Sequence, residues 1–330
     1  MNSYTALRVH NDDHGYRTAI ETLPAPEPAA GEVLIQVSHS SINYKDALAG
    51  TGRGKILKQF PLTGGVDAAG TVARSRDPRF REGDTVIASG WGLSFDHDGG
   101  YAELLCAPAD WLVPVPVGLD PRRAMVLGTA GFTAALAIHR LQVNGQEPGL
   151  GPLLVTGASG GVGCLAIDLL STLGYEVVAV SGKAALADWL RALGAQRIIG
   201  RDELPGGDRP LEKGHWGGAI DNVGGAMLGR LTRTTVPRGN IAAIGLAGGS
   251  ELETTVMPFI LRGISLLGIN SVDVPYPLRC EIWQHLASDW HPRHLDKVLT
   301  ATVTLNQLPQ AFEQLLAGQS HGRTLVEIGA

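Results

Sequence analysis

The sequence has few charged residues and no excess of positive charge. Charged residues make up 18% of the 330 residues and the formal net charge is −5, against roughly 25% charged residues in an average chain. Disordered chains combine high charge with few apolar residues, whereas 44% of this chain is hydrophobic. A nucleic-acid partner needs a basic patch, which this mildly acidic chain does not indicate. We therefore expect a globular protein that binds no nucleic acid.

Cysteine is also scarce, and long apolar runs are missing. The three cysteines, Cys106, Cys164 and Cys280, are far apart, which argues against a disulfide framework and favours a reducing compartment. The most apolar stretch, residues 124–138, is short and interrupted by glycine and threonine. Residues 1–10 lack a basic segment followed by an apolar one. We expect a cytoplasmic protein with no membrane partner, no membrane span and no signal peptide.

Glycine, in contrast, is abundant. It accounts for 44 of the 330 residues, nearly double the share of roughly 7% in average chains. No strict Gly-X-Y period runs through the chain, which excludes collagen. The excess therefore needs an explanation from particular loops and turns.

The first third of the chain has the pattern of a β-rich unit. Apolar residues occupy every second position in 32–38, and 85–88 and 102–106 are further strand-like runs. Turn signals rich in glycine, proline and aspartate separate them. This pattern predicts a compact barrel-like unit with long loops.

From about residue 124 the pattern changes to strands that alternate with helices. Such alternation predicts a parallel sheet with helices on both faces. Residues 124–141 are predicted to be helical, and the tail contains a predicted helix at 308–317 and a final strand at 324–328. The predicted strands between them are 153–156, 176–180, 197–199, 219–223, 241–244 and 266–269, and the predicted helices are 162–173 and 184–193.

The strongest motif is the segment Val-Thr-Gly-Ala-Ser-Gly-Gly-Val-Gly at 155–163. It follows a predicted strand and opens a predicted helix, which is the context that a phosphate-binding turn requires. Residues without Cβ let backbone N–H groups approach a pyrophosphate, and the helix N-terminus adds unpaired donors and a positive dipole end. The last glycine, Gly163, lets the helix pack closely on the strand. We therefore predict that this turn binds a dinucleotide.

The end of the second predicted strand indicates which dinucleotide. An NAD site places an Asp or Glu about 20 residues beyond the glycine turn, where it accepts a hydrogen bond from the ribose 2′-hydroxyl. Here Ser181, Gly182 and Lys183 follow the strand, with no carboxylate among them. A hydroxyl and a cation suit a 2′-phosphate, and Arg201, after the third strand, is a second candidate. These residues favour NADPH over NADH.

At this point the sequence resembles the medium-chain dehydrogenase/reductase superfamily over nearly its whole length. In the zinc alcohol dehydrogenases of that superfamily, a Cys-x-x-Asp and a Gly-His-Glu-x-x-Gly segment hold catalytic zinc. The matching stretches here are 43–46 and 65–70, where Asn43 replaces the cysteine and Val66 the histidine. Three scattered cysteines cannot build a Cys₄ structural site either. We expect no bound metal.

Several longer segments are similar to one branch, the zinc-free, quinone-oxidoreductase-like AcuI/YhdH type. They occupy positions 41–48, 128–134, 209–213, 255–262 and 322–326. The resemblance implies an α/β fold with two domains. A GroES-like β-barrel catalytic domain would comprise 1–123 and 272–330, and a Rossmann doubly wound parallel-sheet domain would comprise 124–271 and bind NADP. It also implies a homodimer that pairs the strands at 266–269.

The resemblance implies site residues as well. Tyr44 of the Asn-Tyr-Lys-Asp segment would lie against the cofactor, as a proton donor or as a packing residue over the nicotinamide, and Asn43 would contact substrate. Lys183 stands where an arginine is frequent in the family, and a lysine lacks bidentate phosphate geometry. The other cofactor-binding positions implied are Thr129, Thr133, Ser159, Gly160, Gly161, Val162, Ser181, Gly182, Arg201, Leu246, Ile260, Ser271 and Gly318.

The activity implied by this branch is NADPH-dependent reduction of acryloyl-CoA to propanoyl-CoA without a metal. Enolate charge would then develop on the thioester oxygen, and hydrogen-bond donors would have to stabilise it. Arg53, Lys55 and Lys58 form a local basic cluster, which would receive CoA phosphates or would simply be a solvated charged loop. Two alternatives stay open: a quinone or enone oxidoreductase on the same fold, and a non-catalytic NADPH-binding protein.

Overall fold

The computed structural model describes residues 2–329, which form two compact units. The first unit comprises 2–129, 272–287 and 299–329, and the second comprises 130–271 and 288–298. Against the expected boundaries, 124–129 lies with the first unit and 288–298 with the second. Hydrogen bonds explain both differences. Thr129 bonds to Asp67 in the first unit, and the backbone of His294 bonds to Asp168 in the second.

The first unit is built on two sheets. One contains seven strands, and the other is formed by an N-terminal hairpin and one short strand. The larger sheet has the order β15 (Leu299–Thr304), β16 (Arg323–Glu327), β3 (Glu32–Ser41), β5 (Asp67–Ser75), β6 (Thr85–Ser89) and β8 (Leu112–Pro114), with β7 (Leu104–Pro108) also paired to β3. The smaller has the order β2 (Gly15–Pro24), β1 (Ser3–Asp12) and β4 (Leu62–Thr63).

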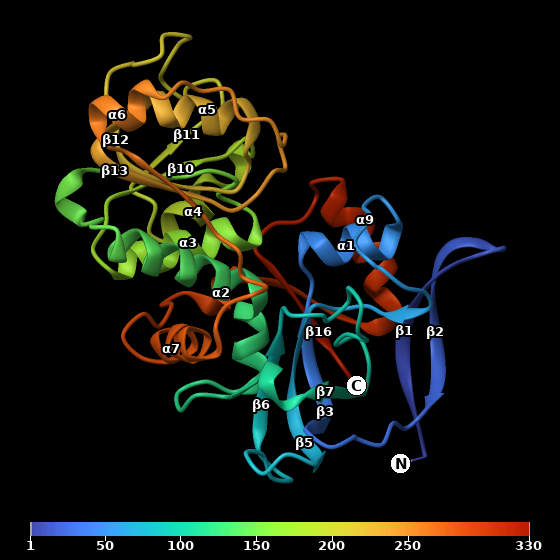
Figure 1. Ribbon diagram of the computed structural model, residues 1–330. Helices are drawn as coiled ribbons and strands as arrows, with labels where there is room; N and C mark the ends of the chain where they lie inside the picture. Colours follow the sequence, from blue (N-terminus) through green and yellow to red (C-terminus); the bar gives the residue numbers. More distant parts are fainter. Residues whose placement is uncertain (1, 330) are drawn as a thin grey trace. The chain divides into compact units, whose positions relative to one another are not determined.

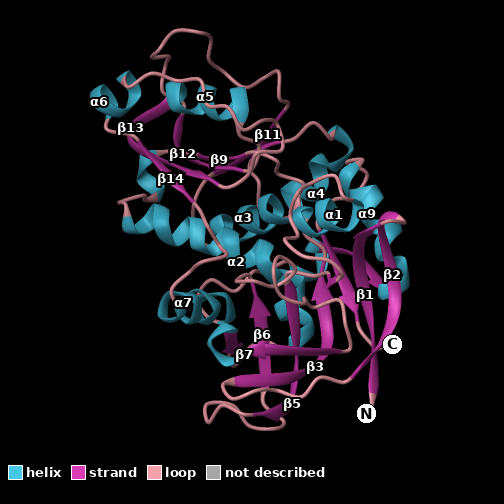
Figure 2. Cartoon of the chain, turned by 45° about the vertical axis from the view of Figure 1, so that its right-hand side comes forward, coloured by secondary structure: helices cyan, strands magenta, loops and turns pink. Residues whose placement is uncertain are grey.

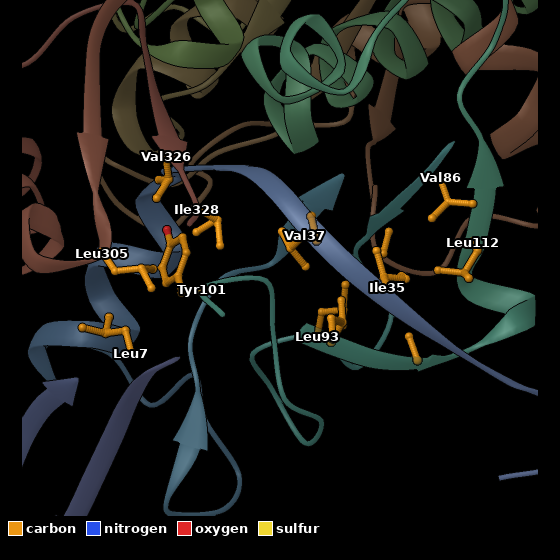
Figure 3. Packing of buried hydrophobic residues seen from close by; sticks show 14 of the residues in the cluster. Leu7, Ile35, Val37, Val86, Leu93, Tyr101, Leu112, Leu305, Val326 and Ile328 are labelled. Atoms are coloured by element: carbon orange, nitrogen blue, oxygen red, sulfur yellow. The ribbon is translucent and has the colours of Figure 1, made fainter. Parts of the chain in front are cut away.

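The predicted strands of this unit are confirmed at β3, β6 and β16, whereas the strand expected at 102–106 begins two residues later, at Leu104. On β3, Val33, Ile35 and Val37 point into one apolar core, as their alternation predicts. Figure 3 shows this core, with Tyr101, Leu305, Val326 and Ile328 gathered at one end and Ile35, Val86 and Leu112 at the other. Apolar side chains from the N-terminal and C-terminal parts of the chain therefore share one core in this barrel-like unit.

Two helices of the first unit, α1 (Tyr44–Thr51) and α9 (Leu308–Leu316), lie side by side (Figure 1). They approach closely because α1 carries Gly50, where a Cβ atom would lie 2.4 Å from the ring of Phe312. Neither α1 nor α7 (Tyr276–Ala287) was expected from the sequence, whereas α9 matches the predicted helix. Two 3₁₀ helices complete the unit, η1 (Ala109–Trp111) and η4 (Leu305–Gln307).

The second unit is a six-stranded, fully parallel sheet with helices on both faces. Figure 2 shows α3 on one face and α5 and α6 on the other. The order is β11 (Arg197–Ile199), β10 (Val177–Val180), β9 (Leu153–Val155), β12 (Trp216–Asp221), β13 (Thr235–Ala243) and β14 (Ser265–Gly268). The helical segments are α3 (Gly161–Thr172), α4 (Ala187–Ala192), α5 (Gly225–Thr234), α6 (Met257–Arg262), α8 (Leu295–Val298), η2 (Pro148–Leu150) and η3 (Ala184–Leu186).

This strand order confirms the predicted doubly wound fold, because it runs outward in both directions from the first strand, β9. The helix expected at 184–193 is divided into η3 and α4, and Gly194 follows it with φ +112°. Each of the six expected strands is present, although β12 and β13 begin earlier than expected, at Trp216 and Thr235.

Helix α2 (Pro121–Val143) is longer than the predicted helix and is interrupted at Gly128, whose backbone is left-handed at φ 51°. It is the one helix within 2–329 that is long and apolar enough to cross a membrane by length and composition. However, 83% of that apolar window is buried inside the protein, as in a core helix.

Candidate functional site: a glycine cradle and a buried polar network

The turn between β9 and α3 has the geometry that its glycines predict. Gly157 adopts a left-handed backbone with φ +58°, which side-chain-bearing residues rarely adopt. A Cβ atom on Gly163 would lie 2.4 Å from the carbonyl oxygen of Gly157. The helix therefore packs directly on the turn, in contact that a larger residue would prevent. We call this segment, residues 155–163, the glycine cradle.

The cradle is fixed to the neighbouring strand β12. Thr156 donates its hydroxyl to Asp221 over 2.6 Å, and Asn222 donates its amide to the Thr156 carbonyl over 2.8 Å. Asp221 is fully buried, which raises the pKa of its carboxyl. The two strands are the point from which the sheet is wound in opposite directions, and ligands of such sheets bind outside the carboxyl ends of the strands at this point.

The cradle also carries backbone donors at the start of α3. Ser159, Gly161 and Val162 are partly exposed and Gly160 is exposed. These residues include the first residues of α3, whose N–H groups have no partner within the helix. Together with the positive end of the helix dipole, these donors suit a pyrophosphate. All four are residues that the sequence predicted for cofactor binding.

Arg201, after β11, lies against the segment that follows β10. Lys183 donates its backbone N–H to the Ser181 hydroxyl over 3.1 Å, and Arg201 lies against Gly182, where a Cβ atom would be 3.4 Å from its Nε. Partial burial lowers the pKa of Lys183. A guanidinium over a backbone position without a side chain has the chemistry that suits a phosphate.

In the first unit, Asp67 is the centre of a buried network of hydrogen bonds. Asp67 is fully buried at the start of β5. Its carboxylate accepts hydrogen bonds from the Ser41 hydroxyl (2.6 Å), the Asn43 amide (2.7 Å) and both the N–H and the hydroxyl of Thr129 (2.9 and 2.7 Å). Thr129, a predicted cofactor residue, therefore directs these two donors into the protein.

Arg323, at the start of β16, supplies the cation of this network. Its guanidinium donates to the Ser41 hydroxyl (2.7 Å), the Asn43 side chain (3.2 Å) and two backbone carbonyls, and Arg323 is 3% exposed. Gly128 is needed beside them, since a Cβ atom there would lie 2.5 Å from Ser41 Oγ and 2.7 Å from an Asp67 oxygen.

A second buried carboxylate, Asp46, connects this network to helix α1. It accepts the backbone N–H of Asn43 (2.9 Å), the Asn43 amide (3.1 Å) and the backbone N–H of Val66 (2.9 Å). Burial, and secondly the charge of Asp67, raise the pKa of Asp46 to about 7. Asp46 thus caps α1 and fixes its first turn. Tyr44 opens that turn and is 51% exposed.

The remaining predicted cofactor residues are divided between the two units. Leu246 and Ile260 are strongly exposed, at 68% and 74%, whereas Thr133 is buried and Ser271 is half-buried. Gly318 follows α9 in the first unit and has φ +71°.

The basic loop predicted to receive CoA phosphates is partly neutralised. Arg53 forms an ion pair with Glu313 at 2.7 Å, and Lys58 lies 3.6 Å from a carboxylate oxygen of Asp96. Lys55 is exposed. The loop therefore retains less free positive charge than its sequence indicates.

Sequence reasoning missed the residues that build the polar network, above all Asp67, Arg323 and Ser41. One signal was present. Asp67 and Arg323 are single charges beside apolar strand residues, and a buried charge has to be paired or hydrogen-bonded. Nothing in the sequence indicated that residues 41, 67, 129 and 323 would meet.

The positions that resemble zinc-ligand positions carry other groups. Asn43 is hydrogen-bonded inside the network, and Val66 is a buried apolar residue. In the part of the chain that the structure describes, no three His, Cys, Asp or Glu side chains are grouped to hold a metal ion.

Comparison with known proteins agrees with this architecture. The family model "Alcohol dehydrogenase GroES-like domain" matches residues 29–117, and "Zinc-binding dehydrogenase" matches 161–288. Acrylyl-CoA reductase AcuI from Ruegeria pomeroyi is 44% identical over 330 residues, with 99% of this chain and 100% of the relative covered.

Two solved structures extend the comparison. The yhdH oxidoreductase from Salmonella enterica, in complex with NADP, is 46% identical with a TM-score of 0.94, covering 98% of this chain and 99% of its own. The yhfP protein from Bacillus subtilis, with NAD bound, is 44% identical with a TM-score of 0.95, covering 99% and 100%.

A GroES-like unit combined with a doubly wound parallel sheet is the fold of the medium-chain dehydrogenase/reductase superfamily, a class of oxidoreductases. Within that superfamily the chain belongs to the AcuI/YhdH family.

Proposed function

We propose that this protein uses NADPH to reduce the C=C bond of a short enoyl-CoA thioester, converting acryloyl-CoA to propanoyl-CoA. The relative AcuI, whose name gives this activity, matches over the full chain. The observation that carries the proposal is the buried network of Asp67, Asn43 and Arg323, which holds α1 rigidly and leaves Tyr44 exposed at its start.

The glycine cradle, Ser181, Gly182, Lys183 and Arg201 would hold NADPH. When bound, NADPH supplies the hydride that adds to the β-carbon of the thioester. The cradle fits because its glycines leave room for a pyrophosphate and α3 offers backbone donors. Arg201, which lies against Gly182, and Lys183, the next residue, would receive the 2′-phosphate.

The choice between NADPH and NADH can be tested directly, which matters because the yhfP structure contains NAD. We expect Lys183→Ala combined with Arg201→Ala to weaken NADPH binding about tenfold or more, since each charge-assisted hydrogen bond contributes about 1.5–3 kcal/mol. NADH binding should stay unchanged. Nucleotide fluorescence titration measures both, and an unchanged NADPH/NADH preference would contradict the assignment.

Tyr44 would act on the substrate. As hydride reaches the β-carbon, the π electrons of the C=C bond move toward the thioester carbonyl and form an enolate, whose oxygen needs a hydrogen-bond donor. The Tyr44 hydroxyl would supply it, and the α-carbon would then take a proton from Tyr44 or from water. Asn43, Asp46, Asp67 and Arg323 would act as positioning residues, because their hydrogen bonds are made within the protein.

The function is tested by measuring NADPH oxidation with short enoyl-CoA thioesters, quinones and simple enones. We expect acryloyl-CoA to give the highest kcat/KM. A quinone or enone that exceeds it would establish the second candidate, an oxidoreductase of that class, which the name of the Bacillus subtilis relative YhfP favours. No oxidation with any acceptor would indicate a non-catalytic NADPH-binding protein.

We further propose that the protein forms a homodimer through β14. We also propose that it is located in the cytoplasm. β14 is the edge strand of its sheet, and edge strands carry unpaired backbone groups that can pair with a second copy. The three cysteines are free thiols, which supports a reducing compartment. Light scattering should give twice the chain mass of 34.7 kDa, and a monomer would contradict the dimer.

A further inference from the structure

A pair of lysines lies over one aromatic ring in the first unit. The Lys58 ammonium is 4.1 Å from the centre of the Phe95 ring, and the Lys45 ammonium is 5.5 Å from it. The ring is held by backbone contacts, since the N–H of Lys58 donates to the Phe95 carbonyl over 2.7 Å. Two ammonium groups therefore lie within 5.5 Å of the centre of one half-buried aromatic ring.

This arrangement is directly connected to the exposed Tyr44. Lys45 is the next residue, in the first turn of α1, where a cation is electrostatically unfavourable because the helix dipole is positive there. Asp96 lies 3.6 Å from Lys58, and both side chains are about half exposed (49% and 59%). Such an exposed ion pair contributes at most about 1 kcal/mol, so an incoming phosphate can replace it.

We propose that Lys45 and Lys58 bind phosphate groups of coenzyme A, with Phe95 as the surface beneath them. The inference rests on the proposed enoyl-CoA substrate. The residues proposed to bind CoA phosphates therefore differ from those predicted from the sequence. Arg53 is paired with Glu313, whereas Lys45 joins Lys58 at the ring. A thioester at Tyr44 would extend its phosphate-bearing end along Lys45 toward Phe95.

The experiment compares acryloyl-CoA with acryloyl-pantetheine, which carries the same acyl group and no phosphate. For the double variant K45Q/K58Q, we expect the KM for acryloyl-CoA to rise about tenfold or more, as for the loss of charge-assisted contacts. Its KM for acryloyl-pantetheine and its KM for NADPH should change less than about twofold. Asp96→Asn should lower the KM for acryloyl-CoA, because residue 96 would no longer compete with the phosphate for Lys58.

Two controls decide whether the effect is local. Lys213→Gln removes one positive charge at an exposed lysine of the second unit and should leave every KM unchanged. Lys55→Gln changes a lysine of the same loop and should raise the KM less than Lys58→Gln does. An equal rise for all lysine variants, or an equal rise for both thioesters, would overturn the phosphate site.

Different results would contradict the proposed substrate class and the proposed phosphate site. If wild-type protein reduces neither thioester but reduces quinones, the proposed substrate class is wrong and the phosphate site falls with it. If wild-type protein reduces both thioesters with the same KM, the enoyl reductase activity stands and the phosphate site is wrong.

Discussion

The glycine cradle and the buried polar network are built in opposite ways. The cradle is nine consecutive residues whose shape depends on missing side chains, such as the Cβ that Gly163 cannot carry. The network depends on side chains that are far apart in the sequence. Arg323 and Ser41, which share a 2.7 Å hydrogen bond, are separated by 282 positions. The cradle of the second unit is therefore a local motif, whereas the polar network of the first unit is a product of tertiary packing.

The largest effect is expected where the network loses its cation. Arg323→Met would remove the buried donor to Ser41 Oγ, the Asn43 side chain and two backbone carbonyls, and each buried polar group left without its partner costs about 1–3 kcal/mol. Urea denaturation measures the loss. Arg17→Met is the matched control, because Arg17 forms an exposed ion pair with Asp12 and its loss should cost far less. Similar decreases in the free energy of unfolding for both variants would contradict a stabilising role of the network.

We propose that the polar network positions Tyr44, and the variant Tyr44→Phe tests the role of that side chain. We expect kcat to fall about a hundredfold, as for loss of one donor to a developing oxyanion. The free energy of unfolding should hardly change because the side chain is 51% exposed. Steady-state kinetics with acryloyl-CoA measures kcat. A turnover number near that of wild type would identify Tyr44 as a packing residue.

Even the methyl side chain of alanine is expected to disturb the packing of the glycine cradle. Gly163→Ala would place a Cβ atom 2.4 Å from the Gly157 carbonyl and should cost about 1–3 kcal/mol together with much of the NADPH affinity. Gly149→Ala, in η2 of the same unit and outside the cradle, is the control, because no atom beyond its chain neighbours would lie closer than 3.8 Å to its Cβ. Thermal unfolding with and without NADPH separates the two effects, and equal behaviour of the two variants would refute the close packing.

The pH dependence of stability is expected to give the smallest effect when it is counted per pH unit. The pKa of Asp46 is raised to about 7 in the folded protein, against about 3.9 in an unfolded chain. Between these values the folded state keeps a proton that the unfolded state has lost, so stability falls as pH rises, by up to about 1.4 kcal/mol per pH unit. Asp46→Asn should flatten the stability profile between pH 4.5 and 7. Parallel profiles for the two proteins would exclude this titration.

In the second unit the six strands and the helices that follow β9 and β10 could be predicted because their signals are local, whereas α5, α6 and α8 were not predicted. Strand and helix periods alternate there, and the expected strands are present in the order that a doubly wound sheet requires. In the first unit, the hairpin of β1 and β2 and the helices α1 and α7 were missed. Helix α1 is only eight residues long and depends on Asp46, whose partners Asn43 and Val66 are fixed by packing of other elements. Short helices of this kind have little signal of their own.

By itself, the sequence determined the doubly wound sheet, the glycine turn of the cradle and the absence of a carboxylate after β10, because each depends on neighbouring residues. Only the tertiary structure decided that Asp67, Arg323 and Asn43 form one buried network, that Arg53 is neutralised by Glu313, and that Lys45 and Lys58 share the Phe95 ring. The reason is physical. Burial makes an unpaired charge costly, so distant charged and polar residues are brought together by the fold, and no local pattern records which of them will meet.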